Sequence, residues 1–329
     1  MSTPTHTSAK TILLTGGAGF IGFHTARALL DRGDTVVMVD DLNDYYDVSL
    51  KLARVEELKK HPHAERLTFV VGDVADYAML EEVYSTHPFT HICHLAAQAG
   101  VRYSLEQPFS YERANLLGFL NILELARHKQ ITNLIYASSS SVYGANTKTP
   151  FAETDMTDRP VSLYAATKKA NELMAHAYHH LYGINCTGLR FFTVYGPWGR
   201  PDMAPMGFAK KMCAGEPIDI YNGGDMKRDF TYIDDIVAGV VSAIDHSYAW
   251  EVFNLAYGRS VPLLAYIEAL ERALGVTAVR TLLPMQPGDV PVTDADISHA
   301  KEKLGYDPAT SVTEGVATFA QWYRQYYAV

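Results

Sequence analysis

Residues 11–22 of this chain read TILLTGGAGFIG, a β-branched run followed at once by spaced glycines. Gly16, Gly19 and Gly22 have G-x-x-G-x-x-G spacing, in place of the commoner G-x-G-x-x-G. Glycine lets a backbone turn tightly and approach a phosphate, and a helix that starts at such a turn stabilises an anion at its N-terminus. The stretch therefore predicts a strand, a phosphate-binding turn and a helix; the alternative is a purely structural turn.

Four more strand-like runs follow, and each of the five comes before an amphipathic stretch. The runs are Thr11–Thr15, Thr35–Val39, Leu67–Val71, His91–Leu95 and Asn133–Ala137. Strands that alternate with helices form βαβ units and a parallel sheet. We therefore predict an α/β protein with a Rossmann-type doubly wound parallel sheet and a smaller C-terminal α/β lobe that binds the substrate.

The alternation stops after Phe191. Turns rich in Gly and Pro follow at 196–201 and 222–225, with a strand-like run at Ile218–Tyr221 and helical patterns at Leu263–Leu274 and Val312–Tyr327. We expect a cofactor-binding domain over 1–197 and a substrate-binding lobe over 198–329, with part of 232–260 returning to the first domain. The substrate is expected in the cleft between them.

Composition narrows the class of protein. The 329 residues are 48% hydrophobic and carry a net charge of −9 without a basic stripe, which argues against a nucleic-acid partner.

The polar start Met1–Lys10 and the lack of a run of about 18 apolar residues predict a cytoplasmic protein with a frayed N-terminus and no membrane span. Cys93, Cys186 and Cys213 lie far apart and are expected to be reduced core thiols.

Acidic residues after the second and third strands complete the dinucleotide pattern. Asp40, with Asp41 beside it, ends the second strand where a ribose-binding acid belongs. A carboxylate there accepts hydrogen bonds from the adenosine 2′-hydroxyl and repels a 2′-phosphate, so NAD is favoured over NADP. Asp73, in Gly72-Asp73-Val74, either meets the adenine edge or caps the next helix.

A serine cluster and a Tyr-x-x-x-Lys motif predict the reacting centre. Tyr164 and Lys168 lie four residues apart, on one face of a helix that should begin near Ser162. The ammonium and a positively charged nicotinamide should favour the phenolate, so Tyr164 can act as a general base while Lys168 holds the nicotinamide ribose. Ser138–Ser141 follows the fifth strand, where open α/β sheets bind ligands, and can hold the reacting oxygen; otherwise it is an ordinary polar loop.

With these motifs the chain resembles the extended short-chain dehydrogenase/reductases, and within them the nucleotide-sugar 4-epimerases, from Ile12 to about Trp322. The likeness to UDP-glucuronate 4-epimerases is carried by the runs DDLNDYYD (40–47), HLAAQAGVR (94–102) and RFFTVYGPWGRPDM (190–203). One departure is Asp41, where these epimerases commonly have asparagine, which adds negative charge beside the adenosine ribose. A homodimer through a four-helix bundle is also implied, formed by the helix from Phe109 to His128 and the helix that carries Tyr164.

The resemblance also implies residue roles. It assigns Ser139, Tyr164 and Lys168 to catalysis, Ser141 to the region of the sugar 4-hydroxyl, and Asn115 to the cofactor or a nearby helix. It implies tightly bound NAD in contact with Gly16, Gly19, Phe20, Ile21, Gly22, Asp40, Asn43, Asp73, Val74, Leu95, Ala96, Ala97, Tyr164, Lys168 and, packing on the nicotinamide, Phe192. It implies a UDP-sugar in contact with Ser139, Ser140, Ser141, Arg102, Thr193, Arg200, Tyr221 (uracil stacking), Arg228 (diphosphate) and Asp289 (uridine ribose).

The reaction that the resemblance implies is oxidation at C4 of the sugar, rotation of the 4-keto sugar and return of the hydride. Related dehydratases and decarboxylases place acidic residues before Val-Tyr-Gly, where this chain has Ser140 and Ser141. A 4-keto-glucuronate loses carbon dioxide unless its carboxylate is restrained, and Arg200 is our candidate for the restraining cation; the alternative is a surface arginine in a turn. Arg102 is secondary, with phosphate, carboxylate or loop structure as its possible partners.

Three functions stay open at this point. The first is an NAD-dependent UDP-glucuronate 4-epimerase, the second a 4-epimerase of neutral UDP-glucose or UDP-N-acetylglucosamine, and the third a non-catalytic NAD-binding protein on the same fold. Intact Ser139, Tyr164 and Lys168 argue against the third. His176, His179 and His180 have the spacing of a metal face but no acidic partner nearby, so we expect no metal.

Overall fold

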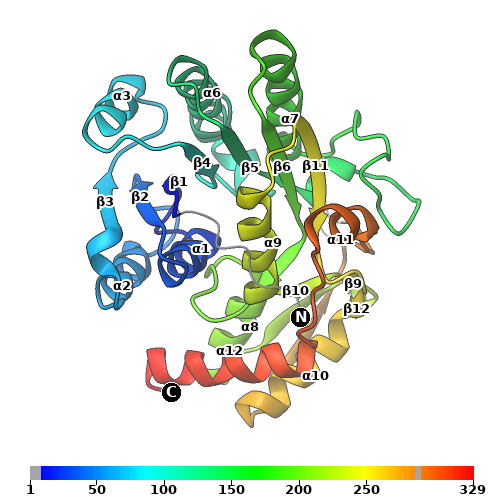
Figure 1. The fold of residues 1–329 in the computed structure, drawn as a ribbon. Helices are drawn as coiled ribbons and strands as arrows, with labels where there is room; N and C mark the ends of the chain where they lie inside the picture. Colours follow the sequence, from blue (N-terminus) through cyan, green and yellow to red (C-terminus); the bar gives the residue numbers. More distant parts are fainter. Residues whose placement is uncertain (1–8, 286–289) are drawn as a thin grey trace, which may run out of the picture.

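Seven parallel strands form the central sheet of the protein, whose computed structural model describes residues 9–285 and 290–329. Their order is β11-β6-β5-β4-β1-β2-β3 (Figure 1). The chain builds outward from β1 in one direction and, from β4, in the other, so the sheet is doubly wound, as predicted, and its switch point lies between β1 and β4. The strands are β1 (Thr11–Thr15), β2 (Thr35–Asp40), β3 (Leu67–Val71), β4 (His91–His94), β5 (Asn133–Ser139), β6 (Cys186–Phe191) and β11 (Trp250–Leu255).

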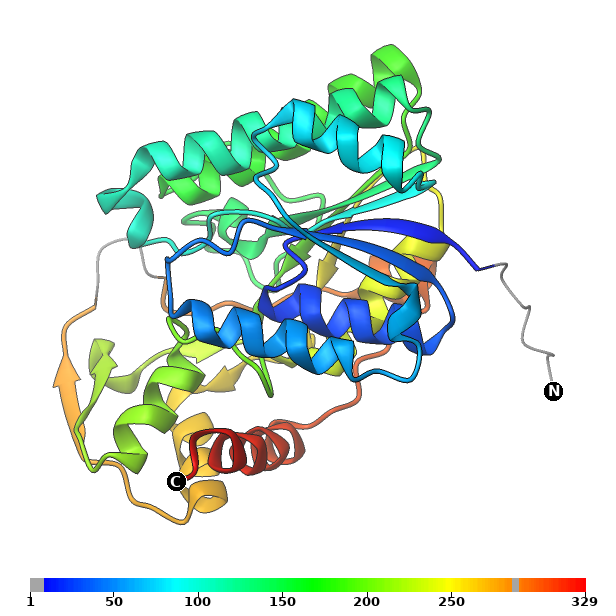
Figure 2. The same ribbon diagram turned by 90° about the vertical axis from the view of Figure 1, so that its left-hand side faces the viewer.

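Helices cover both faces of this sheet, which makes three layers (Figure 2). One face carries α1 (Phe20–Asp31), α2 (Val48–Lys59) and α9 (Ile233–Asp245), and the other carries α3 (Tyr77–Thr86), α6 (Gly118–His128) and α7 (Leu163–Tyr182). Ile12 and Leu14 belong to one buried cluster, whereas Leu13 belongs to another. A strand covered on both faces needs apolar residues at successive positions, which explains the continuous run ILL in β1.

The fifth strand is longer than predicted. It ends at Ser139, not at Ala137, because Ser138 and Ser139 continue the ladder opposite Arg190 and Phe191 of β6. Only the rest of the serine cluster leaves the sheet, as the short 3-10 turn η3 (Ser140–Tyr143). The first two serines are therefore held by backbone hydrogen bonds of the sheet, and the expectation that the whole cluster follows the strand is wrong.

The helix expected from Phe109 to His128 is interrupted. It consists of α5 (Pro108–Tyr111), a π-helical segment η2 (Glu112–Leu117) and α6. Within η2 the side chain of Asn115 accepts a hydrogen bond from the backbone of Gln98 and donates to Thr167 of α7. A π-helical turn re-aims a side chain inside a helix, and here it ties α7 to the segment after β4.

Among its described residues, the C-terminal half adds three two-stranded sheets and further helices on the side of the carboxyl ends of β6 and β11 (Figure 1). Helix α9 packs on α1, and β11 pairs with β6. The division of the chain into lobes at residue 197 stays a prediction. The remaining elements are η1 (Ala64–Arg66), α4 (Tyr103–Glu106), β7 (Thr193–Tyr195) paired with β10 (Phe230–Tyr232), α8 (Ala204–Cys213), β8 (Ile218–Tyr221) paired with β13 (Arg280–Leu283), η4 (Asn222–Gly224), β9 (Lys227–Arg228) paired with β12 (Val261–Pro262), α10 (Leu263–Leu274), α11 (Ser298–Leu304) and α12 (Val312–Tyr327).

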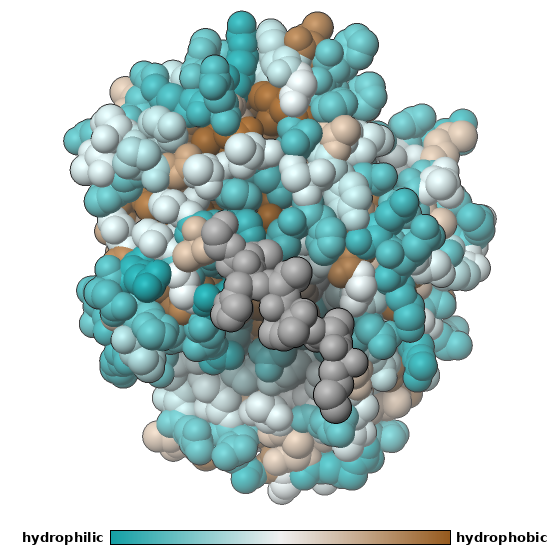
Figure 3. All heavy atoms as spheres, viewed as in Figure 1, coloured by the Kyte–Doolittle hydropathy of each residue, from teal (hydrophilic) through white to brown (hydrophobic). Residues whose placement is uncertain are grey.

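Most of the face in Figure 3 is hydrophilic, with hydrophobic residues showing near the top of the view, where Figure 1 places α6 and α7. Within residues 9–285 and 290–329, no helix combines the length and apolar character that crossing a bilayer requires.

All three cysteines are free thiols, and Cys93 and Cys186 are buried, as predicted. The expected frayed N-terminus lies mostly outside the described residues.

Candidate functional site

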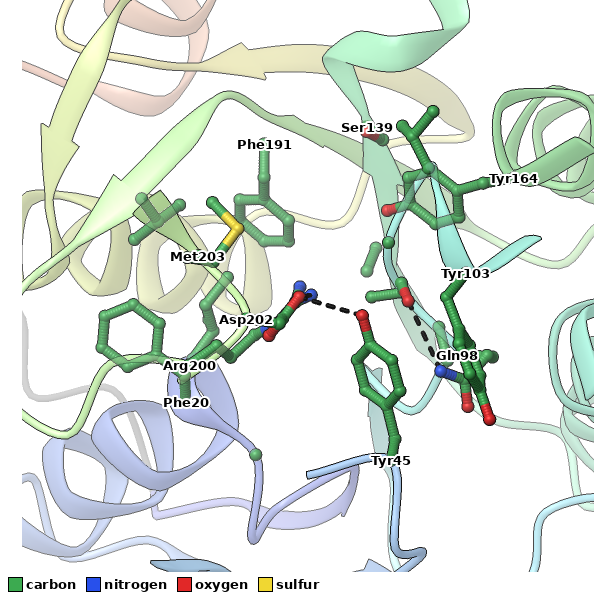
Figure 4. Close-up of a pocket in the computed structure, with 18 of the residues that line it drawn as sticks. Phe20, Tyr45, Gln98, Tyr103, Ser139, Tyr164, Phe191, Arg200, Asp202 and Met203 are labelled. Carbon is green, nitrogen blue, oxygen red and sulfur yellow. Dashed lines mark hydrogen bonds and ion pairs between the residues drawn. The ribbon is translucent and has the colours of Figure 1, made fainter. Parts of the chain in front are cut away.

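A cavity of about 1080 Å³ opens at the carboxyl edge of the sheet, over the switch point. Ligands bind at this place in open α/β sheets. The residues predicted to bind NAD or the UDP-sugar line the cavity wherever the structure describes them, from the glycine turn to Arg228. Asn115 does not line it; it is buried and bonds Gln98 and, on the nearby helix α7, Thr167. Asp289, the predicted ribose contact, lies outside the described residues. Figure 4 shows the central part, where Tyr164, Arg200 and Tyr45 lie around one space.

The glycine turn packs so tightly on neighbouring backbone that Gly16 and Gly22 leave no room for a side chain. Gly16 has a φ of +69°, and a Cβ there would lie 2.6 Å from the backbone nitrogen of Ala96. A Cβ on Gly22 would lie 2.1 Å from the carbonyl oxygen of Gly16. Helix α1 starts directly after Gly19, which has no side chain to cap it. The first N–H groups of α1, at the edge of the cavity, therefore have no side-chain hydrogen-bond partner. This arrangement fits a diphosphate at the helix N-terminus.

Asp40 ends β2 beside the glycine turn and is buried. Its carboxylate accepts hydrogen bonds from the backbone N–H of Ala18, at 3.0 Å, and of Leu42, at 2.9 Å. Burial raises the pKa of Asp40, and these two N–H donors oppose the rise. Asp41 bonds the backbone and side chain of Asn43, while the ammonium of Lys51 donates to the Asn43 carbonyl at 2.7 Å. A cation therefore lies next to the extra negative charge that Asp41 brings.

Asp73 does not cap the next helix. Helix α3 begins at Tyr77, and its cap is Asp76, which accepts from the backbone of Met79. The carboxylate of Asp73 instead accepts from the backbone N–H of Ala75 and pairs with Arg113 at 2.7 Å. The capping alternative for Asp73 is therefore wrong, because the helix starts one short turn later. Asp73 lines the cavity, so a contact with an adenine edge stays a prediction.

Hydrogen bonds hold the side chains of Ser138 and Ser139 at the end of β5. Ser138 donates from its hydroxyl to Glu172 of α7 at 2.7 Å, and the hydroxyl of Ser139 accepts from the backbone N–H of Ser141 at 3.2 Å. Ser140 and Ser141 complete the wall of the cavity at this point. Ser139 lies beside Tyr164, Ser140 and Ser141 line the cavity next to it, and Ser138 anchors the strand end.

Helix α7 presents the tyrosine and the lysine as predicted. It starts at Leu163 with Ser162 as its cap, which places Tyr164 and Lys168 one turn apart on the same face. The ammonium of Lys168 donates to the carbonyl of Ala137 at 2.9 Å, and burial lowers the pKa of Lys168 to about 7. The lysine thereby joins α7 to the end of β5.

Burial and two neighbouring side chains act in opposite directions on the acidity of Tyr164. Burial raises the pKa of Tyr164, and the side chains of Ser139 and Arg200 oppose that rise. Lys168 is not among the groups that oppose the rise, so the effect of its ammonium together with a positively charged nicotinamide on the phenolate stays a prediction. In Figure 4 the Tyr164 hydroxyl points into the space that Arg200 and Tyr45 also face.

Arg200 lies in the cavity wall and has a carboxylate partner from its own loop. Its Nε and Nη2 donate to the two carboxylate oxygens of Asp202, at 3.1 and 2.5 Å. The hydroxyl of Tyr45 donates to the same carboxylate at 3.1 Å (Figure 4). Burial alone disfavours the charged guanidinium, but the Asp202 carboxylate more than offsets it and raises the pKa of Arg200. The candidate cation is thus present in the cavity, but its charge is balanced by Asp202.

The predicted nucleotide-binding residues Arg102, Tyr221 and Arg228 line the same cavity. The guanidinium of Arg102 lies over the ring of Tyr221, 4.9 Å from its centroid, and Arg228 lies nearby on β9. Arg228 also donates to the carbonyl oxygen of Pro291 at 3.1 Å. Arg102 therefore lies next to Tyr221, although the two residues are far apart in the sequence. Two cations and one aromatic ring line this end of the cavity.

Several residues of the site carried no role in the sequence analysis. Tyr45, Gln98 and Asp202 were part of the quoted runs, but only the fold brings Tyr45 and Asp202 together. Lys51, which lines the cavity, and Arg54 and Glu172, which lie behind its wall, had no recognisable signal. The histidines after Tyr164 make structural contacts: His176 packs edge-on against Trp250, and His179 bonds the carbonyl of Ile184.

Comparison with known proteins gives consistent matches over nearly the whole chain. The family described as GDP-mannose 4,6-dehydratase matches residues 13–319. UDP-glucuronate 4-epimerase 4 of Arabidopsis thaliana is 48% identical over 336 residues, which cover 97% of this chain and 76% of the plant protein. The crystal structure of UDP-glucuronic acid 4-epimerase from Bacillus cereus, in complex with UDP-glucuronic acid and NAD, matches with a TM-score of 0.88 at 34% identity, over 96% of this chain and 100% of that chain. UDP-glucose 4-epimerase of Thermotoga maritima, with UDP-glucose, matches with a TM-score of 0.87 at 31% identity, over 96% and 99%.

Proposed function

This chain belongs to the GDP-mannose 4,6-dehydratase family, and from that premise we infer that it is an NAD-dependent 4-epimerase that interconverts UDP-glucuronate and UDP-galacturonate. The observation that carries the substrate assignment is the position of Arg200. Its guanidinium shares one cavity with the glycine turn and with Ser139, Tyr164 and Lys168. A planar, charged fork next to the reacting groups suits a sugar that carries a carboxylate.

The residues present fit NAD. The turn between β1 and α1 closes tightly because Gly16 and Gly22 have no Cβ to collide with neighbouring backbone, the N-terminus of α1 suits a diphosphate, and Asp40 lies where a ribose hydroxyl is bonded. We propose contacts from the residues assigned to NAD above, with Phe192 beside the nicotinamide. When bound, NAD supplies the acceptor for the hydride at C4 of the sugar and the donor that returns it.

The side chains of the chain supply orientation and proton transfer. Tyr164 accepts the proton of the sugar 4-hydroxyl, and the hydroxyl of Ser139 holds the same oxygen. Lys168, fixed against the Ala137 carbonyl, holds the nicotinamide ribose and places a donor beside Tyr164. Arg200 pairs with the sugar carboxylate and keeps it away from the geometry that favours loss of carbon dioxide. Ser140 and Ser141 offer hydroxyls where an acidic residue would promote elimination.

A second candidate is a 4-epimerase of neutral UDP-sugars, and one observation favours it. Because Asp202 already occupies the Nε and Nη2 donors of Arg200, the pair presents no net charge to a ligand. Asp202→Asn separates the two: for an acidic substrate, removal of the competing carboxylate should lower KM, whereas for a neutral sugar KM should not fall.

The direct test is incubation of the purified chain with UDP-glucuronate and no added reductant, followed by proton NMR of the sugar C4 signals. Formation of UDP-galacturonate without net NADH supports the proposal. A UDP-4-keto-pentose with NADH would mean decarboxylation instead, and no reaction with UDP-glucuronate but turnover of UDP-glucose or UDP-N-acetylglucosamine would favour the second candidate.

We also propose that two copies pair through α6 and α7 as a four-helix bundle. Exposed leucines lie on these helices, with 59% of Leu173, 64% of Leu181 and 37% of Leu120 accessible. Exposed apolar side chains on adjacent helices support a partner surface, and a twofold pairing of two helices gives four.

A further inference from the structure

Arg54, on α2, is fully buried and bonds three separate segments. It is 0% exposed. Its Nη1 donates to the carbonyl of Ala18 and to the hydroxyl of Tyr46, each at 2.8 Å. Its Nη2 donates to the carbonyls of Trp198, at 2.6 Å, and Gly199, at 3.3 Å. One side chain therefore joins segments that are up to 181 positions apart.

No carboxylate oxygen lies within 4.0 Å of the Arg54 guanidinium in the described residues, 9–285 and 290–329. A buried charge is costly unless hydrogen bonds satisfy it. Carbonyl and hydroxyl oxygens of the three segments satisfy the Nη1 and Nη2 atoms of Arg54, whereas its buried Nε has no hydrogen-bond partner among the described residues. The burial of Arg54 therefore depends on all of these oxygens staying in place.

Each of the three segments belongs to a different part of the site. Ala18 lies within the glycine turn, and Tyr46 lies in the loop after Asp40. Trp198 and Gly199 come directly before Arg200. Two of the segments therefore face the predicted NAD site, and the third carries the cation that we assign to the sugar carboxylate.

A second link joins the same loop and the same turn on the cavity side. The hydroxyl of Tyr45 donates to Asp202, which holds Arg200 (Figure 4). Below, Arg54 joins the neighbouring Tyr46 to Trp198. Trp198 has a φ of +62°, which a bulky side chain adopts only where its surroundings impose it. The turn before Arg200 is thus shaped by contacts with the loop after β2.

We propose that Arg54 is a positioning residue that links the NAD-binding loops to the Arg200 turn, so that NAD and the carboxylate-bearing UDP-sugar each strengthen the binding of the other. The proposal rests on the proposed function for the identity of the two ligands. Loops that one ligand holds in place no longer have to be ordered when the second ligand binds. Because the link is a coupling free energy, it acts equally in both directions.

The test is the exchange of bound NAD with isotopically labelled NAD from the holoenzyme, with and without UDP-glucuronate. A Tyr164→Phe background lets the sugar bind without reacting. In that background UDP-glucuronate should slow NAD exchange about tenfold, within the usual range of coupling between sites. With Arg54→Lys added, the slowing should fall below about twofold, because one ammonium cannot reach both the Ala18 and the Trp198 sides.

The matched control is Arg324→Lys. The Arg324 guanidinium also donates to a backbone carbonyl, that of Leu274, but it lies outside the cavity. This control should keep the full slowing. The link is disproved if Arg54→Lys keeps the melting temperature of its parent and also keeps the slowing.

If Arg54→Lys does not fold, Tyr46→Phe replaces it, because this change removes only one acceptor of Arg54. A smaller slowing than in the parent then supports the link, and an unchanged slowing disproves it. Epimerisation of UDP-glucuronate by the unmodified chain is measured alongside. Its absence would contradict the proposed function, while the exchange assay reports on the link between the two sets of loops.

Discussion

The carboxylate of Glu172 and the guanidinium of Arg190 form a buried two-point ion pair, with both N–O distances at 2.8 Å. Glu172 follows Tyr164 and Lys168 at four-residue intervals on α7, and it also accepts from the hydroxyl of Ser138. Arg190 donates in turn to the hydroxyl of Tyr143, at the far end of the serine segment. The ion pair therefore fixes the segment 138–143 at both ends, Ser138 and Tyr143, relative to the helix that carries Tyr164.

Glu172→Gln should destabilise the fold by about 3 kcal/mol, because it leaves the Arg190 charge buried without a counter-charge. Urea unfolding of the variant and of the unmodified chain measures the difference. The control is Glu56→Gln, which breaks a pair with Lys59 in which both side chains are more than half exposed. That change should cost under about 1 kcal/mol. Equal effects of the two substitutions would show that burial does not matter here.

The same pair predicts a pH dependence of stability. Burial acts to raise the pKa of Glu172, but Arg190 and Ser138 outweigh it and lower that pKa below 4.5. The unfolded chain therefore binds the proton first as pH falls, and the stabilisation present above pH 4.5 is lost as pH falls through the lowered value. Unfolding free energies between pH 6 and 3 should fall more steeply for the unmodified chain than for Glu172→Gln. Parallel curves would contradict this.

Tyr164→Phe should lower kcat by at least about 100-fold, because it removes the group that exchanges the proton with the sugar 4-oxygen. NAD content and melting temperature should change little, since the ring stays in place. The phenolate form of Tyr164 increases as pH rises toward its pKa, and burial raises that pKa. The kcat/KM of the unmodified chain should therefore increase with pH on its acid side. Tyr182→Phe, at the end of α7, is the control and should keep full activity. A similar loss in both variants would remove Tyr164 from the mechanism.

Arg200→Ala should reduce kcat/KM for UDP-glucuronate by about 100-fold, the equivalent of losing a charged hydrogen-bonded pair of 2–3 kcal/mol. For UDP-glucose the change should stay within about threefold, since no carboxylate is present to be paired. Initial rates with both substrates on the same preparation measure the ratio. A loss of equal size for both sugars would mean that Arg200 shapes the cavity and does not recognise the carboxylate.

Leu173→Glu should shift the proposed dimer toward monomer, because it puts a charge into an apolar surface between two copies. Sedimentation velocity over a range of concentrations measures this shift. Leu282→Glu is the control: Leu282 is 64% exposed, similar to Leu173 at 59%, but it lies on β13, away from α6 and α7. If neither variant changes the sedimentation coefficient, the α6–α7 surface is not the interface.

Much of the fold followed from local patterns in the sequence. The run TILLT, the glycines after it and the alternation of strand and helix predicted a doubly wound sheet, and β8, α10 and α12 have the predicted bounds. Tyr164 and Lys168 were predictable as a pair because a helix places residues four apart on one face. The end of β5 was not, because Ser138 and Ser139 belong to the strand only through their partners on β6.

By itself, then, the sequence determined the class of fold, the glycine turn and the alignment of Tyr164 with Lys168, because each depends on spacing within one segment. Only the tertiary structure decided that Asp202 balances Arg200, that Arg54 joins Ala18 to Trp198, and that burial raises the pKa of Tyr164. These features depend on which distant segments pack together and on how completely they exclude water. Backbone periodicity carries no record of either, so charge pairing and desolvation emerge only when the chain is folded.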